Sequence, residues 1–229
     1  MGRYTRGFNT RMENCRIVNF YTSDYSEVVK PLKKSLDKFG YSVHMEELLP
    51  IGKWEENISI KPEYILKCLN QFNEDLLWID ADGVIERPIP IDEINRNYPN
   101  FYIMSWRAEE SHWKLVHELI SSTMYFPNNN ESKKLLEEWV DRQKEDRMVW
   151  DQKILSEVLN SGKYEYEILP PEWCYIEKYH KSVVTDPIIS QHQASRVMKE
   201  KINFAVDCDE FYPDKLPDID DIDTSILEN

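Results

Sequence analysis

Two aspartates separated by one small residue are the part of this sequence that points most directly to chemistry. Asp80 and Asp82 follow residues 76–79, a short apolar run that predicts a buried strand. In an extended segment, side chains two positions apart point the same way and lie roughly 6 to 7 Å apart. Two like charges on one face are costly to desolvate. A divalent cation that prefers oxygen ligands, Mg²⁺ or Mn²⁺, removes that cost.

The same residues fit other interpretations, which the sequence leaves open. Asp82 and Gly83 form a pair that is common in solvated turns. The segment IDADGVI also has the local pattern of a haloacid-dehalogenase-like phosphatase with Asp80 as nucleophile, although no GDxxxD-like segment follows it. A sugar-nucleotide transferase uses such a pair differently, because its carboxylates hold a cation that neutralises the departing diphosphate.

The elements around the aspartates predict an open α/β sheet. Strands and helices alternate along the chain before Asp80, and this order is typical of a parallel, doubly wound sheet. Such sheets bind ligands at the carboxyl ends of their strands, which is where the two aspartates fall. Pro31 indicates a kink or a late start in the first helix. The predicted strands are 16–21, 42–48, 76–79, 101–106, 122–126 and 188–189, and the predicted helices are 25–39, 62–72, 132–143 and 150–159.

Composition bounds the class of protein. The 229 residues, 41% of them hydrophobic, suit one domain with a sizeable core. The net charge of −14 disfavours a nuclease or a dedicated DNA-binding protein. No apolar run approaches the roughly 18 residues of a membrane span, and no secretory signal is evident, so we expect a cytoplasmic protein. The cysteines form no CxxC pair and are expected to be reduced, namely Cys15, Cys68, Cys174 and Cys208.

The chain divides into three expected parts. Residues 1–15 form a basic N-terminal extension, and residues 16–206 hold the α/β domain. Residues 207–229 are rich in acidic side chains and show no periodicity, so we interpret them as an acidic, loosely docked tail.

An ordered set of segments resembles the GT-A-type glycosyltransferases, in particular small nucleotide-diphospho-sugar transferases of bacteria and viruses. RIVNFYTSDY is similar to their first strand and base-binding turn, and LLWIDADGVIERP to their DxD motif. WEENISIKPEYI is similar to the segment that brings a cation over the donor. WDQKIL resembles a pair found beside the sugar in retaining members, and IISQHQASR a segment with a late histidine ligand. The resemblance implies a single GT-A-like, Rossmann-like domain with a mostly parallel sheet flanked by helices.

The resemblance also implies a role for individual residues. The implied donor-binding residues are Tyr21, Thr22, Tyr25, Lys61, Asp80, Ala81 and Asp82. The implied ligands of a Mn²⁺ or Mg²⁺ ion are Asp80, Asp82 and His192, and the implied catalytic residues are Asp151 and Gln152. The helix that carries Trp139 would line the donor sugar.

Two observations from the residues alone bear on these roles. Lys61 stands just before Pro62, which favours the start of a helix, and the helix dipole disfavours a cation there, so a ligand-directed role is favoured. Trp54, Trp106 and Trp173 could stack on sugar faces, although core packing is the more frequent use of tryptophan.

By the same resemblance, the donor is a UDP-sugar, the reaction is hexosyl or pentosyl transfer, and retention of configuration is slightly favoured. The acceptor stays open. A glycan ranks above a modified DNA base because the chain is acidic, and residues 106–113 and the tail are the expected acceptor elements. Related proteins are often virus- or phage-encoded, which extends the expected location to the cytoplasm of a host. A catalytically silent nucleotide-binding module is the remaining alternative.

Overall fold

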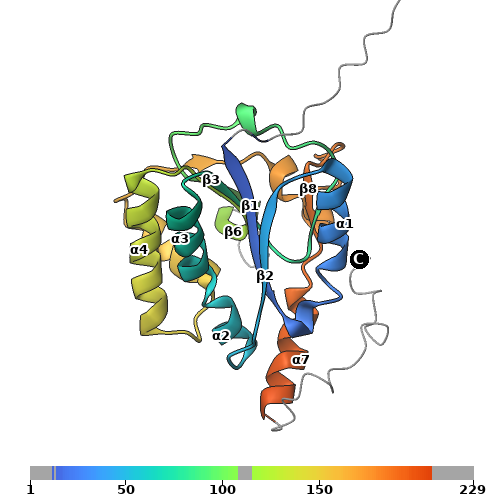
Figure 1. Ribbon diagram of the computed structural model, residues 1–229, viewed down its shortest axis with the longest axis vertical. Helices are drawn as coiled ribbons and strands as arrows, with labels where there is room; N and C mark the ends of the chain where they lie inside the picture. The colour runs from blue at the N-terminus through green and yellow to red at the C-terminus, as the bar shows by residue number, and fades with distance from the viewer. Residues whose placement is uncertain (1–11, 13, 108–114, 208–229) are drawn as a thin grey trace, which may run out of the picture.

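The computed structural model describes residues 12, 14–107 and 115–207. Within those residues, six strands form one sheet in the order β2-β1-β3-β6-β5-β7 (Figure 1). β1 is parallel to β2 and β3, β6 is antiparallel to β3 and β5, and β5 is parallel to β7. The strands are β1 (Cys15–Thr22), β2 (Val43–Leu48), β3 (Asp75–Ile79), β5 (Asn100–Arg107), β6 (Leu115–Phe126) and β7 (Glu167–Ile168).

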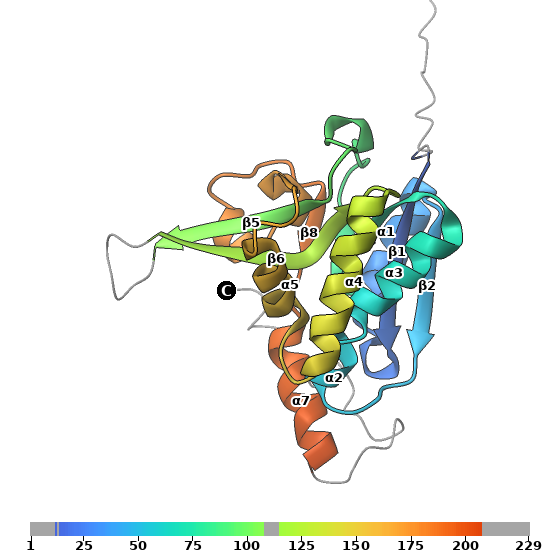
Figure 2. The same ribbon diagram turned by 90° about the vertical axis from the view of Figure 1, so that its left-hand side faces the viewer.

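Helices cover both faces of this sheet. α3, α4 and α5 pack on one face, as Figure 2 shows, and share a core there with residues such as Trp78 and Phe126. α1 covers the other face, together with a short two-stranded sheet. The helices are α1 (Lys30–Phe39), α2 (Trp54–Ile58), α3 (Lys61–Phe72), α4 (Asn130–Glu145), α5 (Asp151–Asn160), α6 (Glu177–His180) and α7 (Ser195–Asp207). Short 3-10 helices span Ser23–Tyr25, Ile91–Glu93 and Pro171–Cys174.

The central strand β3 is buried on both of its faces. Leu76 and Trp78 pack into the core under α3 and α4, while Leu77 and Ile79 pack into the core under α1. A strand covered on both sides has no polar face, which explains the continuous apolar run in the sequence. The predicted buried strand before Asp80 is therefore confirmed.

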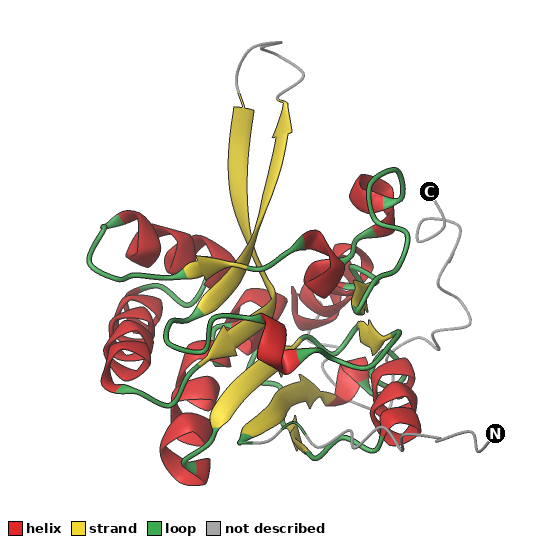
Figure 3. Cartoon of the chain, turned by 90° about the horizontal axis from the view of Figure 1, so that it is seen from above, coloured by secondary structure: helices red, strands yellow, loops and turns green. Residues whose placement is uncertain are grey.

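The second sheet carries the late segment of the chain to the end of β3. β4 (Gly83–Ile85) pairs antiparallel with β8 (Ile189–Gln191), so that Gly83 lies opposite Gln191. β5 and β6 form a long hairpin that extends beyond the rest of the described chain (Figure 3).

The predicted elements all occur, with shifted ends. The first helix begins at Lys30 and not at residue 25, because Pro31 fits only the first turn of a helix. β6 begins at Leu115, seven residues before the predicted strand 122–126, because it pairs with the whole of β5. The N-terminal extension before residue 12, the segment 108–114 and the tail from 208 lie outside the described residues.

None of the described helices has the length and apolarity that a membrane crossing requires. The three described cysteines, Cys15, Cys68 and Cys174, are free and buried, and Cys208 lies outside the described residues.

The double burial of β3 gives a test of the fold. Leu77 is fully buried, so Leu77→Ala leaves a cavity and should lower the free energy of unfolding by about 3 to 5 kcal/mol in urea denaturation. The matched control is Leu49→Ala, because the Leu49 side chain is 85% exposed. This substitution should change the free energy of unfolding by less than about 0.5 kcal/mol. Equal effects of the two substitutions would contradict this packing.

Candidate functional site

The two aspartates lie on a tight turn at the end of β3. The backbone N–H of Gly83 donates to the carbonyl of Asp80 at 2.9 Å, which closes a four-residue turn. A Cβ at position 83 would lie 2.5 Å from Ile79 Cγ2, so only glycine fits there. The expectation of an extended Asp80–Asp82 segment is therefore wrong, because the chain turns as it leaves the sheet. The turn interpretation is confirmed. Both carboxylates line one cleft, and their role as a metal and diphosphate site stays a prediction.

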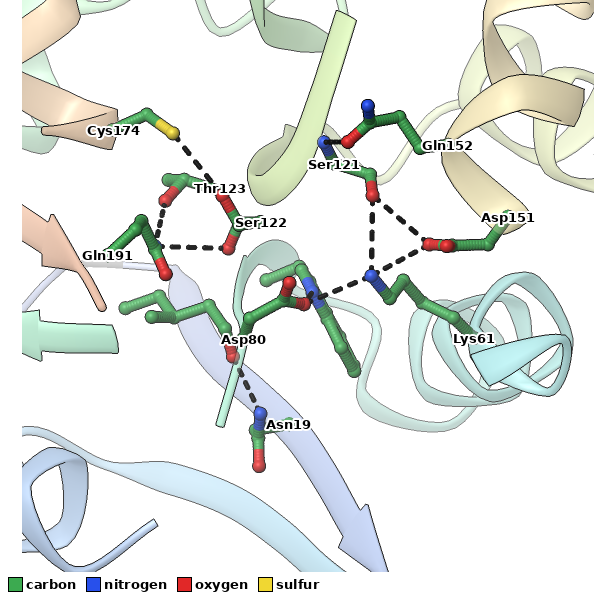
Figure 4. Close-up of polar contacts among 12 residues, drawn as sticks. Asn19, Lys61, Asp80, Ser121, Ser122, Thr123, Asp151, Gln152, Cys174 and Gln191 are labelled. Atoms are coloured by element: carbon green, nitrogen blue, oxygen red, sulfur yellow. Dashed lines mark hydrogen bonds and ion pairs between the residues drawn. The ribbon is translucent and has the colours of Figure 1, made fainter. Parts of the chain in front are cut away.

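Lys61 joins Asp80 to Asp151 (Figure 4). Its Nζ lies 3.0 Å from Asp80 Oδ1 and 2.7 Å from Asp151 Oδ2, and it donates to Ser121 Oγ at 3.4 Å. Lys61 is the first residue of α3 and is only 5% exposed. Burial alone would lower the pKa of Lys61, but the two carboxylates outweigh it and hold the pKa above its usual range. A cation at this helix start is thus explained by its two partners.

Asp80 is fixed by a second donor as well. Trp78 Nε1 donates to Asp80 Oδ1 at 2.7 Å, and the Lys61 ammonium lies 5.4 Å from the centroid of the Trp78 ring. Burial raises the pKa of Asp80 and Lys61 opposes that shift, while Asp151 adds to it. Oδ2 of Asp80 accepts no hydrogen bond from another described residue.

Asp82 is held by the late segment of the chain. The backbone N–H of Ala194 donates to Asp82 Oδ2 at 2.7 Å, just beyond the β4–β8 pairing. Burial and the neighbouring Asp80 raise the pKa of Asp82 to about 6. No described lysine or arginine forms an ion pair with it. Among the described residues, Asp82 is therefore the carboxylate of the cluster without an ion pair to lysine or arginine, although the charge of His192 acts to lower its pKa.

An inner chamber of about 170 Å³ opens at the carboxyl ends of β1 and β3. It is lined by every predicted donor-binding residue and both predicted catalytic residues: Tyr21, Thr22, Tyr25, Lys61, Asp80, Ala81, Asp82, Asp151 and Gln152. Segments from positions 21 to 152 of the chain are thus brought to one cavity. Their roles in binding stay predictions.

The two tyrosines of the inner chamber differ in how they are held. The Tyr21 hydroxyl accepts from Lys33 and donates to Glu47, on the side of α1 and β2. The Tyr25 hydroxyl instead accepts from Trp54 Nε1 at 2.9 Å. Burial raises the pKa of Tyr25 well above its usual value. Tyr25 and Trp54 therefore form one fixed aromatic wall of the chamber.

A larger outer chamber of about 540 Å³ adjoins the inner one. Six residues line both chambers and so mark the boundary between them: Trp54, Asp80, Asp82, Trp150, Gln152 and Ser195. Glu118 on β6, Tyr179, and Arg196 on α7 line only the outer chamber.

A stack of aromatic and cationic side chains forms part of that boundary. Lys199 Nζ lies 4.6 Å from the Trp150 ring centroid and 5.5 Å from that of Trp54. The same ammonium lies 2.7 Å from Glu55 Oε1. α7 is thereby fastened to α2 and to the start of α5 beside the cleft. Cation–π contacts of this kind contribute about 0.5 to 2 kcal/mol each.

Sequence reasoning did not identify several residues of the cleft. Trp150 and Glu118 were missed, as were Ser121 and Trp78, which contact Lys61 and Asp80. Trp150 did carry a signal in the sequence, because it directly precedes Asp151 at the start of a helix. In the structure, its side chain is 46% exposed, which is unusual for tryptophan. Glu118 carried none, because its approach to Gln152 depends on how β6 and α5 pack.

The predicted tryptophan roles divide. Trp54 does line the cleft. Trp139 does not, because its side chain is fully buried in the core, where Nε1 donates to the Asp151 carbonyl. Trp173 is likewise packed in the core at 2% exposure. The side chain of Trp106 and the expected acceptor elements at 108–113 and in the tail lie outside the described residues.

The predicted metal ligands are Asp80, Asp82 and His192. Across residues 12, 14–107 and 115–207, no group of three or more His, Cys, Asp or Glu side chains is arranged to hold a metal ion. The His192 backbone approaches Asp82, but its side chain is exposed and lines neither chamber. Asp80 and Asp82 alone fit a Mg²⁺-type ion that takes one or two carboxylates and completes its shell with substrate phosphates.

Charge balance supports that fit. When ionised, Asp80, Asp82 and Asp151 carry three negative charges against one positive charge on Lys61, a formal sum of −2. A diphosphate brings further negative charge to the same place, and like charges there repel. A divalent cation would offset this excess.

Comparisons with known proteins give the family of the chain and a similar fold. A family model described as nucleotide-diphospho-sugar transferase matches residues 63–204, more than half of the chain. No curated protein matches the sequence. One similar solved structure is described as a glycosyltransferase involved in the glycosylation of the major capsid of PBCV-1. The two share 15% identity with a TM-score of 0.59, over 82% of this chain and 98% of that chain. The expected single domain, with a mostly parallel sheet flanked by helices, is confirmed.

The raised pKa of Asp82 predicts how stability depends on pH without metal. Between the usual aspartate pKa of 3.8 and about 6, the folded state holds more protons than the unfolded state, so stability falls as pH rises. Asp82→Asn keeps the hydrogen bond from Ala194 and removes the charge. In EDTA, its Tm should exceed that of the wild type at pH 8 and match it at pH 4.

The matched control for this prediction is Asp141→Asn, at an exposed position on α4, which should leave Tm unchanged at both pH values. Thermal melts followed by circular dichroism give the measurement. A Tm for Asp82→Asn at or below the wild-type value at pH 8 contradicts the prediction.

Proposed function

The chain belongs to the nucleotide-diphospho-sugar transferase family, and on that premise we propose that it transfers a sugar from a UDP-sugar to a carbohydrate hydroxyl. The proposal includes dependence on Mn²⁺ or Mg²⁺. The observation that carries it is the cluster in which buried Lys61 bridges Asp80 and Asp151, next to Asp82, which forms no ion pair with a described lysine or arginine. A fold at low identity does not specify chemistry, so the support for the proposal comes from the residues of this cluster.

The donor occupies the inner chamber in this proposal. The diphosphate lies by the turn at Asp80 and Asp82, where the negative charge requires a counter-ion. The nucleoside extends toward the end of β1, between Thr22 and the aromatic wall of Tyr25 and Trp54. Support comes from the location of these side chains around one cavity, since donor sites are concave and hold a few fixed polar groups.

The reaction forms a bond between the acceptor oxygen and C1 of the sugar and breaks the bond between C1 and the diphosphate oxygen. The electron pair of the broken bond leaves with the diphosphate, where negative charge increases. A divalent cation held by Asp80 and Asp82 would supply positive charge at that oxygen. Lys61 holds Asp80 through the 3.0 Å ion pair and opposes the rise that burial causes in the pKa of Asp80, and the burial of Lys61 protects these interactions from water.

Asp151 and Gln152 are proposed to act beside the sugar. Asp151 fixes Lys61 through the 2.7 Å ion pair, and Gln152 lies at the boundary of the two chambers. Retention of configuration stays part of the proposal, on the resemblance of this pair to that of retaining members. The proposal covers both hexosyl and pentosyl donors.

A carbohydrate acceptor is proposed over a DNA base. The net charge of −14 and the acidic lining of the cleft oppose the approach of a phosphate backbone. A neutral glycan hydroxyl meets no such repulsion. The similar PBCV-1 enzyme takes part in glycosylation of a capsid protein, and a protein-linked glycan is accordingly the first acceptor to test.

Isothermal titration calorimetry with UDP tests the donor and metal proposals together. The wild type should bind UDP in the presence of Mn²⁺, and EDTA should weaken binding on the order of 100-fold, about 2.8 kcal/mol. Asp82→Asn should weaken binding in Mn²⁺ to the same degree, because the variant keeps its fold but loses a metal ligand. Asp141→Asn is the control.

Binding that is equal with and without EDTA, or that survives unchanged in Asp82→Asn, rejects the metal-diphosphate proposal. Release of UDP from UDP-sugars by the wild type separates an enzyme from a catalytically silent binding module. The phosphatase alternative predicts hydrolysis of p-nitrophenyl phosphate, which a sugar transferase lacks.

A further inference from the structure

The outer chamber contains a carboxylate with no role in the donor cluster. Glu118 lies on β6 and is half-buried, and its Oε1 accepts from Gln152 Nε2 at 2.8 Å. Gln152 is fixed in turn, because its Oε1 accepts from the backbone N–H of Ser121 at 3.3 Å. Ser121 also contacts Lys61 (Figure 4). Glu118 is thus tied by two hydrogen bonds to the cluster that would hold the diphosphate.

Glu118 has the electrostatic character of a base. Burial raises the pKa of Glu118, opposed by the hydrogen bond from Gln152 and by the charge of Arg196. Within the described ranges, Glu118 forms no ion pair. The other charged or titratable groups that line its chamber are Asp80, Asp82, Tyr179, Arg196, Lys199 and Glu200. A carboxylate that is partly desolvated and not paired with a cation binds a proton more readily than one in water.

A second side chain of the outer chamber, Gln191, has an oxygen that accepts no hydrogen bond from a described residue. Gln191 is 5% exposed, and its Oε1 is buried without a hydrogen-bond partner. Its Nε2 donates to Thr123 Oγ1 at 2.8 Å and to the Ser122 carbonyl at 3.3 Å, which fixes the orientation of the amide (Figure 4). A buried, unpaired acceptor is costly, and a hydroxyl from a ligand would satisfy it.

We propose that the outer chamber binds the acceptor sugar, with Glu118 taking the proton of its reacting hydroxyl and Gln191 accepting a hydrogen bond from a second hydroxyl. This assignment rests on the proposed transferase function. Its chamber shares Asp80, Asp82 and Gln152 with the donor chamber, so an acceptor oxygen there lies next to the leaving group. A polyhydroxylated ligand fits two hydrogen-bond acceptors beside the aromatic side chains of Trp150 and Tyr179.

The proton and the electron pair of the reaction are both accounted for. The hydroxyl proton passes to Glu118, the oxygen binds C1, and the C1–oxygen bond to the diphosphate breaks with its electron pair on the diphosphate. The acceptor oxygen loses its proton whichever face of C1 it attacks.

The test uses the full chain with Mn²⁺ and follows UDP release from UDP-glucose, UDP-galactose and UDP-N-acetylglucosamine. Water and a panel of methyl glycosides are the acceptor probes. Glu118→Gln should lower kcat by about 100- to 10,000-fold, while the Kd for UDP stays within threefold, because only the proton acceptor is lost. Glu137→Gln, at an exposed position on α4, is the matched control and should behave as wild type.

Two further variants separate proton transfer from structural support. Glu118→Ala should regain part of its rate when sodium formate is added, since formate supplies a carboxylate in the vacated space. Gln191→Leu should raise KM for the methyl glycoside that serves best, with UDP affinity unchanged.

The outcomes distinguish this inference from the proposed function. A wild type that neither binds UDP nor releases it from any donor overturns both. An active wild type with Glu118→Gln within threefold of it, or a Glu118→Ala variant that formate does not restore, overturns the assignment of Glu118 alone. An unchanged KM in Gln191→Leu overturns the part played by Gln191.

Discussion

One buried lysine shared by two carboxylates organises the functional end of this molecule. Lys61 joins the first turn of α3 to the end of β3 and the first turn of α5 through Asp80 and Asp151. Removing one member would leave buried charge without a partner, which typically costs 3 to 5 kcal/mol. The cluster still has a formal charge of −2 with Asp82 included. It is therefore fixed in geometry yet incomplete in charge, as a site for a cation and a phosphate group should be.

The sheet explains why these side chains meet. Parallel pairing of β1 and β3 brings their carboxyl ends to one edge, and the antiparallel β6 adds Ser121 and Glu118 beside them. β8 then pairs with β4 and delivers the Ala194 N–H to Asp82. The chambers consequently share one boundary, with the proposed donor-binding residues on one side and Glu118 on the other. A direct chain of hydrogen bonds through Gln152 links the two sides.

The sequence was informative where chemistry and local structure coincide. The apolar run before Asp80 predicted a buried strand, and the misfit of Lys61 at a helix start indicated a ligand-directed role, where the structure places two carboxylate partners. The sequence did not predict features whose position depends on how distant segments pack together. The turn at Gly83 replaced the expected extended segment, because β4 had to reverse toward β8. Glu118 reaches the cleft only through packing against Gln152, 34 residues further along the chain, which no local pattern encodes.

The central claim is that the charge left on Asp80 and Asp82 is offset by a divalent cation shared with a diphosphate. Anomalous diffraction from crystals grown with UDP and Mn²⁺ tests it most directly. The account predicts a manganese peak within bonding distance of a carboxylate oxygen of Asp82 or Asp80 and of a phosphate oxygen of UDP. A nucleotide that occupies the inner chamber with no manganese peak at either aspartate, or a peak elsewhere on the protein, would contradict it.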